Sequence, residues 1–583
     1  MMKLSIQNRI HQVIGLMMPA FGVAAIVSLF LKFGFNLSNQ WIVNLLILDE
    51  IIAGFFVISL LVNLFISDEK WQYIKQSPLE FILLLLFIIS LVLEKIISVE
   101  EPHYILKTTT SHSFIKLYFI IIEIYIVING IISLTKTREK WLFFSLSPAR
   151  ILMISYVIVI VAGTLMLKLP KATYSGITWI DALFTSTSAV CITGLTTLNI
   201  SHVFTFEGQV FILLLIQLGG LGIITLTSFI ALFIQKGFRL RGQMIVQEVL
   251  DNENISSLAS ILKAIVTITF ITELVGAIGL YLSWKDLGMP EFERIFSAVF
   301  HSVSAYCNAG FSIFPNGLET PGFHFNTISL ITIMLLIVFG GLGFYTYSDV
   351  MHIGDIKMIR KKGLTLQTRM ILITTLLLIL SGALVVWISQ YAQWKDLPFG
   401  KQILNAFFLS ITSRTAGFST VSISELAVPT LMMVMLLMYI GGAPNSTSGG
   451  IKLTTMVTIL ASLRTFVKGK NRVEIGWNTI PMRTVRRAFI VLVVSVILIF
   501  LVLFVLTWTE DHAFFDILFE IISAFGTVGL SRGITPDLTL TGRLMIILVM
   551  FAGRIGLFTF AIAMSEERED DGYNFPEINL MVG

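Results

Sequence analysis

Four glycines, Gly194, Gly310, Gly417 and Gly529, recur along the chain at intervals of 107 to 116 residues. Each closes a segment of similar design between two long apolar stretches. The segments read FTSTSAVCITGL, FHSVSAYCNAGF, FFLSITSRTAGF and FEIISAFGTVGL. A Phe stands ten positions before every one of these glycines, at 184, 300, 407 and 519. An internal repeat of this kind predicts four copies of one structural unit.

The chemistry open to these segments is the coordination of a cation by backbone oxygens. They share no charged or catalytic side chain, so the glycine is their constant element. Glycine adopts backbone conformations that other residues resist, and a ring of carbonyl oxygens can replace the hydration shell of a potassium ion. The residues expected to form such a selectivity filter are Val190, Cys191, Ile192, Thr193, Gly194, Tyr306, Cys307, Asn308, Ala309, Gly310, Ser413, Arg414, Thr415, Ala416, Gly417, Phe525, Gly526, Thr527, Val528 and Gly529.

For any single segment, a glycine that caps or packs a helix is an equally good interpretation. Four matching segments at matching positions favour the filter. The stretch before each glycine is expected to form a short helix whose C-terminal end points at the cavity, where the helix dipole favours a cation.

A second repeated element follows each segment. It reads LGGLGIIT (218–225), FGGLGFYT (339–346), IGGAPNSTSGGIKLTT (440–455) and FAGRIGLFT (551–559). Small residues let membrane helices approach closely, and this packing role suffices for the first two copies.

The third copy interrupts an apolar span with a polar, glycine-rich run. Such a run cannot continue a regular helix, and its freed backbone must face water or protein. It therefore predicts a gating loop below the filter, with a passive kink as the alternative. The gate residues are expected to be Gly441, Gly442, Pro444, Asn445, Ser446, Thr447, Ser448, Gly449, Gly450, Lys452 and Arg554.

Arg554 lies inside the apolar stretch of the fourth copy. A charge within the membrane usually faces a water-filled cavity or a partner. Two roles stay open: it repels ions or anchors the loop, or it forms a structural salt bridge to an acid such as Glu520, Asp349 or Glu273.

Composition places all these segments in a membrane. The chain has 583 residues, of which 55% are hydrophobic and 13% charged, against about 25% charged in soluble proteins. A net charge of +4 does not suggest nucleic-acid binding. The two cysteines, Cys191 and Cys307, both lie in repeated segments, which argues against a disulfide framework or a metal site.

A spanning helix needs about 20 mostly apolar residues. Four spans are expected before the repeats, at 13–33, 43–66, 79–99 and 113–134. Eight more flank the glycine segments in pairs, at 151–169 and 208–235, 260–283 and 325–350, 370–391 and 427–463, and 487–508 and 541–564. The enclosed segments are too short or too polar to span, so they must be re-entrant.

The predicted fold class is therefore an all-α polytopic membrane protein. Four helix–pore loop–helix repeats surround a pseudo-fourfold pore, and about four extra transmembrane helices precede them. The expected boundaries are 1–147 for the extra helices, 148–250, 251–366, 367–483 and 484–564 for the repeats, and 565–583 for a C-terminal tail. Lys and Arg gather at 136–150, 236–241, 357–362 and 468–487, which places these loops and both termini in the cytoplasm.

Taken together, these features resemble the Trk/Ktr/HKT superfamily of cation transporters. The segment TSAVCITGLTT looks like the first pore loop of that family, and the GGAPNSTSGGIK break, the arginine in GRIG and the ending FPEINLMVG are further marks. The resemblance covers about 148–583. The four N-terminal helices depart from it, because the usual bacterial pore subunit begins near the first repeat.

The resemblance implies potassium uptake across a bacterial inner membrane. In that family, glycine at all four filter positions goes with potassium selectivity, whereas serine in the first loop goes with sodium permeation in some plant members. It also implies a homodimer and a cytosolic nucleotide-binding regulatory subunit. No GxGxxG or Walker motif occurs in this chain, so the nucleotide would belong to that partner, and no cofactor is expected here besides potassium as substrate.

Other functions stay open beside this one. A sodium- or proton-coupled symporter also has broken helices, but it would show inverted repeats, and the four copies here run in the same direction. A sodium-permeable relative of the same family is a further alternative. A membrane enzyme has no support, since no residues with catalytic spacing lie in or near the spans.

Overall fold

The computed structural model describes residues 20–66, 148–222, 258–323, 326–351, 364–470, 472–557 and 559–560, with a few single positions between 17 and 85. These residues are mostly helical, as predicted. The described part holds one sheet, an antiparallel pair of β1 (Glu474–Ile475) and β2 (Asn478–Thr479). The predicted span at 113–134, most of the span at 79–99 and the tail at 565–583 lie outside the described residues.

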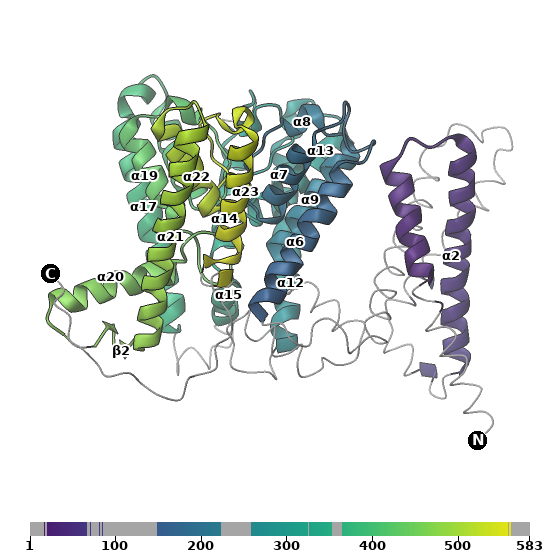
Figure 1. The fold of residues 1–583 in the computed structure, drawn as a ribbon, viewed down its shortest axis with the longest axis horizontal. Coiled ribbons are helices and arrows are strands. Elements are labelled where there is room, and N and C mark those ends of the chain that lie inside the picture. Colours follow the sequence, from purple (N-terminus) through teal and green to yellow (C-terminus); the bar gives the residue numbers. More distant parts are fainter. Residues whose placement is uncertain are drawn as a thin grey trace.

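Two N-terminal helices, Ala20–Gly34 and α2 (Asn39–Ile66), form a pair beside the rest of the chain (Figure 1). Asp49 is buried between them, where it pairs with Lys32 and accepts a hydrogen bond of 2.7 Å from Ser28. The end of the first helix meets the repeats, because the backbone N–H of Lys171 donates to the carbonyl of Gly34 at 3.0 Å.

From residue 148 onward the same order of elements occurs four times: a long helix, a short helix, an irregular segment with its glycine, and a second helix. The first helices are α6 (Pro148–Leu167), α12 (Leu258–Ser283), α17 (Leu366–Trp394) and α21 (Met482–Thr509). The short helices are α7 (Trp179–Val190), α13 (Glu291–Tyr306), α18 (Phe399–Thr412) and α22 (Phe514–Gly526). The second helices are α9 (Phe206–Leu221), α14 (Thr327–Gly341), α19 (Val428–Tyr439) and α23 (Leu540–Ile555).

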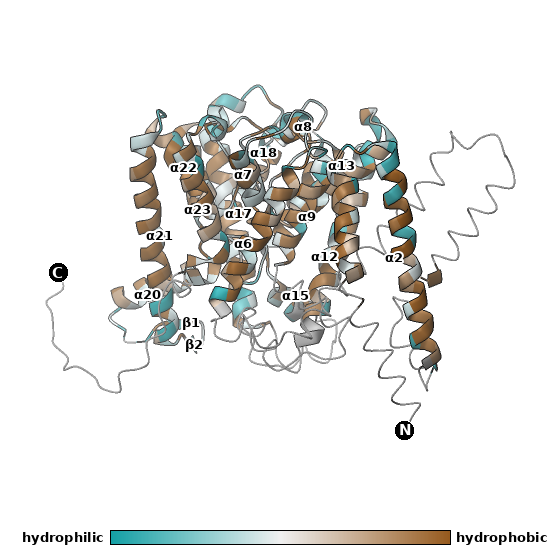
Figure 2. Cartoon of the chain, turned by 45° about the vertical axis from the view of Figure 1, so that its right-hand side comes forward, coloured by the Kyte–Doolittle hydropathy of each residue, from teal (hydrophilic) through white to brown (hydrophobic). Residues whose placement is uncertain are grey.

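Five helices in the described part are long and apolar enough to cross a membrane: α2 and the first helix of each repeat. Apolar residues line the helices along their length, and polar residues collect toward their two ends (Figure 2). This distribution suits helices that stand across the hydrocarbon layer.

Within the described residues, three of the four second helices end at or next to a glycine with a positive φ. Gly222 and Gly556 directly follow α9 and α23, and Gly343 follows α14 after Leu342; their φ values of 78°, 90° and 80° are incompatible with a continuing α-helix. The single span predicted at 325–350 is therefore wrong, since α15 (Phe344–Met351) starts as a separate helix after Gly343.

In the third repeat the second helix is broken over a longer stretch. Helix α19 ends at Tyr439 and α20 (Leu453–Val467) begins at Leu453, so the span predicted at 427–463 is two helices joined by an irregular loop. Figure 1 shows α20 turning away from the bundle, across the direction of the other helices.

Candidate functional site

The four repeated glycines lie beside one another in a closed ring that follows the order of the chain. The evidence is the space that a Cβ atom would occupy on each of them. That Cβ would lie close to the carbonyl oxygen preceding the next glycine: 2.5 Å from Ala309 for Gly194, 2.6 Å from Ala416 for Gly310, 2.1 Å from Val528 for Gly417, and 2.2 Å from Thr193 for Gly529. The last of these contacts joins the fourth repeat to the first, and no side chain fits at any of the four positions.

The backbone of the four segments is alike and unusual. Each ring glycine has a positive φ, between 67° and 95°. The residue two positions earlier is also left-handed, although it is not glycine: Ile192, Asn308, Thr415 and Thr527 have φ of 56°, 58°, 73° and 49°. Such conformations cost about 1–3 kcal/mol each and persist only where the surroundings impose them. Their recurrence in all four copies marks the ring as a site with an imposed shape.

Hydroxyl groups at the ends of the short helices help to impose it. Gly194 N–H donates to Ser188 Oγ at 3.0 Å, and Gly529 N–H donates to Ser523 Oγ at 3.1 Å. In the other two copies the hydroxyl acts as donor to the residue after the glycine: Ser304 to Phe311 O at 2.8 Å and Thr412 to Phe418 O at 2.7 Å. Sequence reasoning missed these four residues, although a Ser or Thr five or six positions before every glycine was a visible signal.

In repeat three the hydroxyl residue Thr412 stands five positions before its glycine, Gly417, whereas the separation is six in the other three repeats. The fully buried counterpart of Phe184, Phe300 and Phe519 is therefore Phe408. The spacing of ten residues that pointed to Phe407 is coincidental, since Phe407 is only half-buried and lines an apolar hollow between α14 and α18.

The short helices end three to five residues before their glycines, so all four C-terminal ends approach the ring. Each C-terminus carries about half a negative charge, which favours a cation near them. The second helices pack closely against the C-terminal ends of the short helices. A Cβ on Gly219, Gly340 or Gly553 would lie only 1.9–2.2 Å from the carbonyl oxygen of Val190, Tyr306 or Phe525. The packing role predicted for the first two copies therefore extends to the fourth.

The loop between α19 and α20 lies against the glycine segments of repeats two and four. Asn308 and Ser448 are hydrogen-bonded through the amide and Oγ at 3.0 Å, and Thr447 Oγ1 donates to Tyr306 O at 3.3 Å. A Cβ on Gly449 would lie 2.2 Å from Thr527 Oγ1. The predicted gate residues are thus brought into contact with the predicted filter residues.

Two cationic side chains donate hydrogen bonds to this loop. The Arg554 guanidinium donates to the carbonyl of Thr447, and to that of Gly219 in repeat one at 2.5 Å. Lys452 Nζ donates to the carbonyl of Ser448 at 2.5 Å. Arg554 therefore contacts the loop directly, which is the geometry that the first of its two predicted roles requires.

The acids suggested as salt-bridge partners of Arg554 have other contacts. Glu273 accepts from Gln217 at 3.2 Å and lies 3.8 Å from Cys307 Sγ, Glu520 accepts from Thr535, and Asp349 accepts from Thr365. Cys307 and Cys191 are both buried free thiols. Arg414, predicted to contribute only its carbonyl, has a buried side chain that borders a small hollow with Thr375, Gly442 and Ser448.

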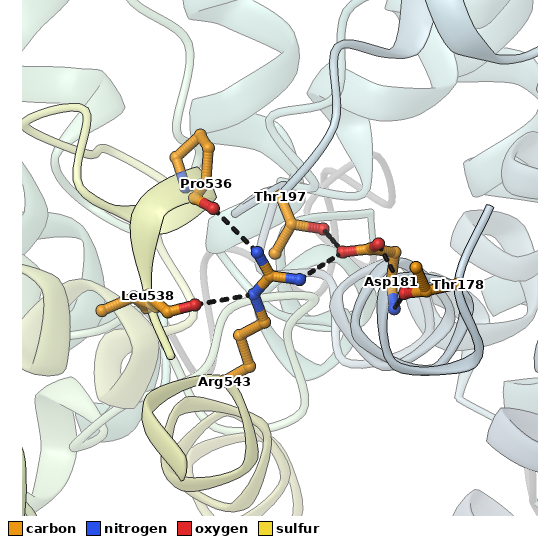
Figure 3. A network of polar contacts seen from close by, with 6 residues as sticks. All are labelled: Thr178, Asp181, Thr197, Pro536, Leu538 and Arg543. Atoms are coloured by element: carbon orange, nitrogen blue, oxygen red, sulfur yellow. Dashed lines mark hydrogen bonds and ion pairs between the residues drawn. The ribbon is translucent and has the colours of Figure 1, made fainter. Parts of the chain in front are cut away.

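A further polar contact joins each pair of neighbouring repeats beyond the ring. Asn199 of repeat one donates to the Pro315 carbonyl of repeat two at 2.7 Å, and Ser419 of repeat three lies 2.8 Å from Glu319 of repeat two. Arg532 of repeat four donates to the Ser424 carbonyl of repeat three at 3.2 Å. Arg543 of repeat four pairs with Asp181 of repeat one at 2.8 Å. The last is an ion pair, at the only boundary that the chain itself does not bridge. In Figure 3, Arg543 reaches from α23 to Asp181 of α7 while it also donates to the carbonyls of Pro536 and Leu538.

Comparison with known proteins agrees with this architecture. The family model described as TrkH, cation transport protein, matches residues 117–574. The chain is 35% identical to the Ktr system potassium uptake protein B of Bacillus subtilis, over 76% of this chain and 98% of that protein. It is also 35% identical to the potassium/sodium uptake protein NtpJ of Enterococcus hirae, over 75% and 98%. The crystal structure of the potassium transporter TrkH from Vibrio parahaemolyticus matches with a TM-score of 0.61 over 84% of this chain and 98% of that one, at 18% identity, which shows a shared fold.

Proposed function

The chain belongs to the TrkH family of cation transport proteins, and from this premise we propose that it is the potassium-translocating subunit of an uptake system in the bacterial cell membrane. The observation that carries the proposal is the closed ring of four glycines. It is built from four separate repeats, so one chain would form one complete pore.

The ring and the carbonyls next to it act as the selectivity filter. The oxygens of Thr193, Ala309, Ala416 and Val528 lie at the ring, where they replace water around a dehydrated ion. The four helix C-termini near the ring add favourable potential for a cation. The remaining predicted filter residues, from Val190, Tyr306, Ser413 and Phe525 onward, supply further carbonyls along the axis.

The loop at 441–450 acts as the gate. It contacts filter residues of two repeats, and Arg554 and Lys452 hold it in place. Conduction then requires the contacts of Thr447 and Ser448 to open. Movement of a regulatory subunit on the cytoplasmic side supplies the force for this, and that subunit carries the nucleotide.

The orientation and assembly follow the family. The loops rich in Lys and Arg and both termini lie in the cytoplasm, the chain forms a homodimer, and it holds no cofactor of its own. Inward flux is driven by the membrane potential, which contributes about 2.3 kcal/mol per charge for each 100 mV.

Rubidium uptake into proteoliposomes loaded with potassium chloride tests this function. Purified protein should concentrate labelled rubidium in a sodium-free bath, because potassium leaving through the same pore makes the interior negative. Protein-free liposomes are the control. Uptake that appears only with external sodium would overturn the proposal in favour of a sodium-coupled symporter. Equal competition by sodium and potassium would favour a sodium-permeable relative, as the name of the Enterococcus protein suggests.

A further inference from the structure

We infer that a cavity next to the glycine ring, between repeats three and four, is a second binding site for a monovalent cation, with Glu319 as its charged ligand. The inference rests on the proposed function and adds a site through which ions reach the filter. The cavity is lined by Gly417 and Gly529 of the ring, by Ser419, Ser422 and Ser531, and by Glu319. It therefore opens directly onto two of the four ring positions.

Glu319 is brought to this cavity from another repeat. It lies in the segment that follows the filter of repeat two, while the rest of the lining comes from repeats three and four. Ser419 Oγ lies 2.8 Å from Glu319 Oε1, and its one proton is shared between this carboxylate and the Val421 carbonyl, so the carboxylate lies at the cavity wall of repeat three. The side chain is half-buried, and no Lys or Arg pairs with it among the described residues.

The one cation in the lining is already neutralised. Arg532 forms an ion pair with Asp516 and donates to the carbonyl of Ser424 at 3.2 Å. The charge of Arg532 is thus balanced by Asp516, and Glu319 leaves the cavity with one uncompensated negative charge. Because negative charge in a concave site raises the local concentration of cations, the cavity attracts cations rather than anions.

The ligand set favours a monovalent ion. Calcium sites usually combine several carboxylates with carbonyls at short distances, whereas this cavity has one carboxylate among neutral serine hydroxyls. A partly hydrated potassium or rubidium ion can use the hydroxyls in place of some waters before it enters the ring. Glu319 would act on the capture of the ion, not on its passage through the ring.

The test is the concentration dependence of rubidium uptake by Glu319→Gln. Two unit charges near contact in water interact by an amount equal to about a fivefold change in binding. We therefore expect KM for rubidium to rise about fivefold with little change in maximal rate, and Glu319→Asp to stay near wild type. Glu293→Gln is the matched control, because Glu293 is exposed in the first turn of α13 in the same repeat and does not line the cavity.

Binding of labelled rubidium to the purified protein gives a readout that does not depend on turnover, and its Kd should weaken by the same factor in Glu319→Gln. An unchanged KM and Kd in Glu319→Gln, or the same rise in Glu293→Gln, would overturn the inference. If the wild-type protein concentrates rubidium, either of these results leaves the proposed function intact. If the wild-type protein shows no uptake, the proposed function itself is refuted.

Discussion

Alanine at the ring glycines should lower potassium selectivity, and the distances rank the four variants. A Cβ on Gly417 or Gly529 would lie 2.1 or 2.2 Å from the neighbouring carbonyl oxygen, against 2.5 and 2.6 Å for Gly194 and Gly310. Real Cβ atoms essentially never approach closer than 3.0 Å. The neighbouring backbone must therefore retreat by about 0.8–0.9 Å in the first pair and by about 0.4–0.5 Å in the second.

Backbone strain adds to this displacement and can be separated from it. The ring glycines have φ between 67° and 95°, which costs an L-residue about 1–2 kcal/mol. Gly176 is the matched control, since its φ is 76° but a Cβ there would meet nothing within 4 Å. Gly176→Ala therefore reports the strain alone.

The assay is sodium inhibition of rubidium uptake, with each variant normalised to the amount of protein in the membrane. A retreating carbonyl fits potassium less well, so Gly417→Ala and Gly529→Ala should lose about tenfold or more in selectivity, equivalent to about 1.4 kcal/mol. Gly194→Ala and Gly310→Ala should lose less, and Gly176→Ala nothing. Wild-type selectivity in Gly417→Ala, or the reverse ranking, would refute the reasoning from the ring.

Three further predictions concern the contacts around the ring. Arg554→Gln removes the hydrogen bonds from Arg554 to the loop at 441–450 and to Gly219, and it should raise rubidium flux. Deletion within 441–450 should raise the flux as well. An unchanged flux in both variants would argue against a gate at this loop. Asp181→Asn should lower the thermal stability of the purified protein. Breaking a buried ion pair costs about 3–5 kcal/mol, and the partial exposure of Arg543 (20%) reduces this cost to about half. If the double variant Asp181→Arg with Arg543→Asp restores no stability, the ion pair does not close the ring. Ser188→Ala leaves the Gly194 N–H without its acceptor, costs about 1–3 kcal/mol and should reduce selectivity; unaltered sodium inhibition would show that the hydroxyl does not shape the filter.

The sequence predicted those features that depend on local chemistry. The spacing of the glycines revealed the four repeats, and the run from Gly441 to Gly450 marked the break between α19 and α20, because such residues cannot continue a helix. The break at Gly343 was missed, since a single glycine inside an apolar stretch is compatible with an unbroken span. The shorter third repeat was missed for a related reason: both Phe407 and Phe408 are aromatic, and only burial distinguishes them.

The sequence by itself determined that this is a helical membrane protein with four copies of one unit, and that glycine occupies one position in each copy. Hydrophobicity and backbone preference are properties of single residues and short segments, so they can be read along the chain. Only the tertiary structure decided that the four glycines meet in a ring, that Arg554 donates to the loop, and that Asp181 meets Arg543 across 362 residues. These contacts depend on how the repeats are placed around one axis, and the packing that places them is not encoded in any one segment.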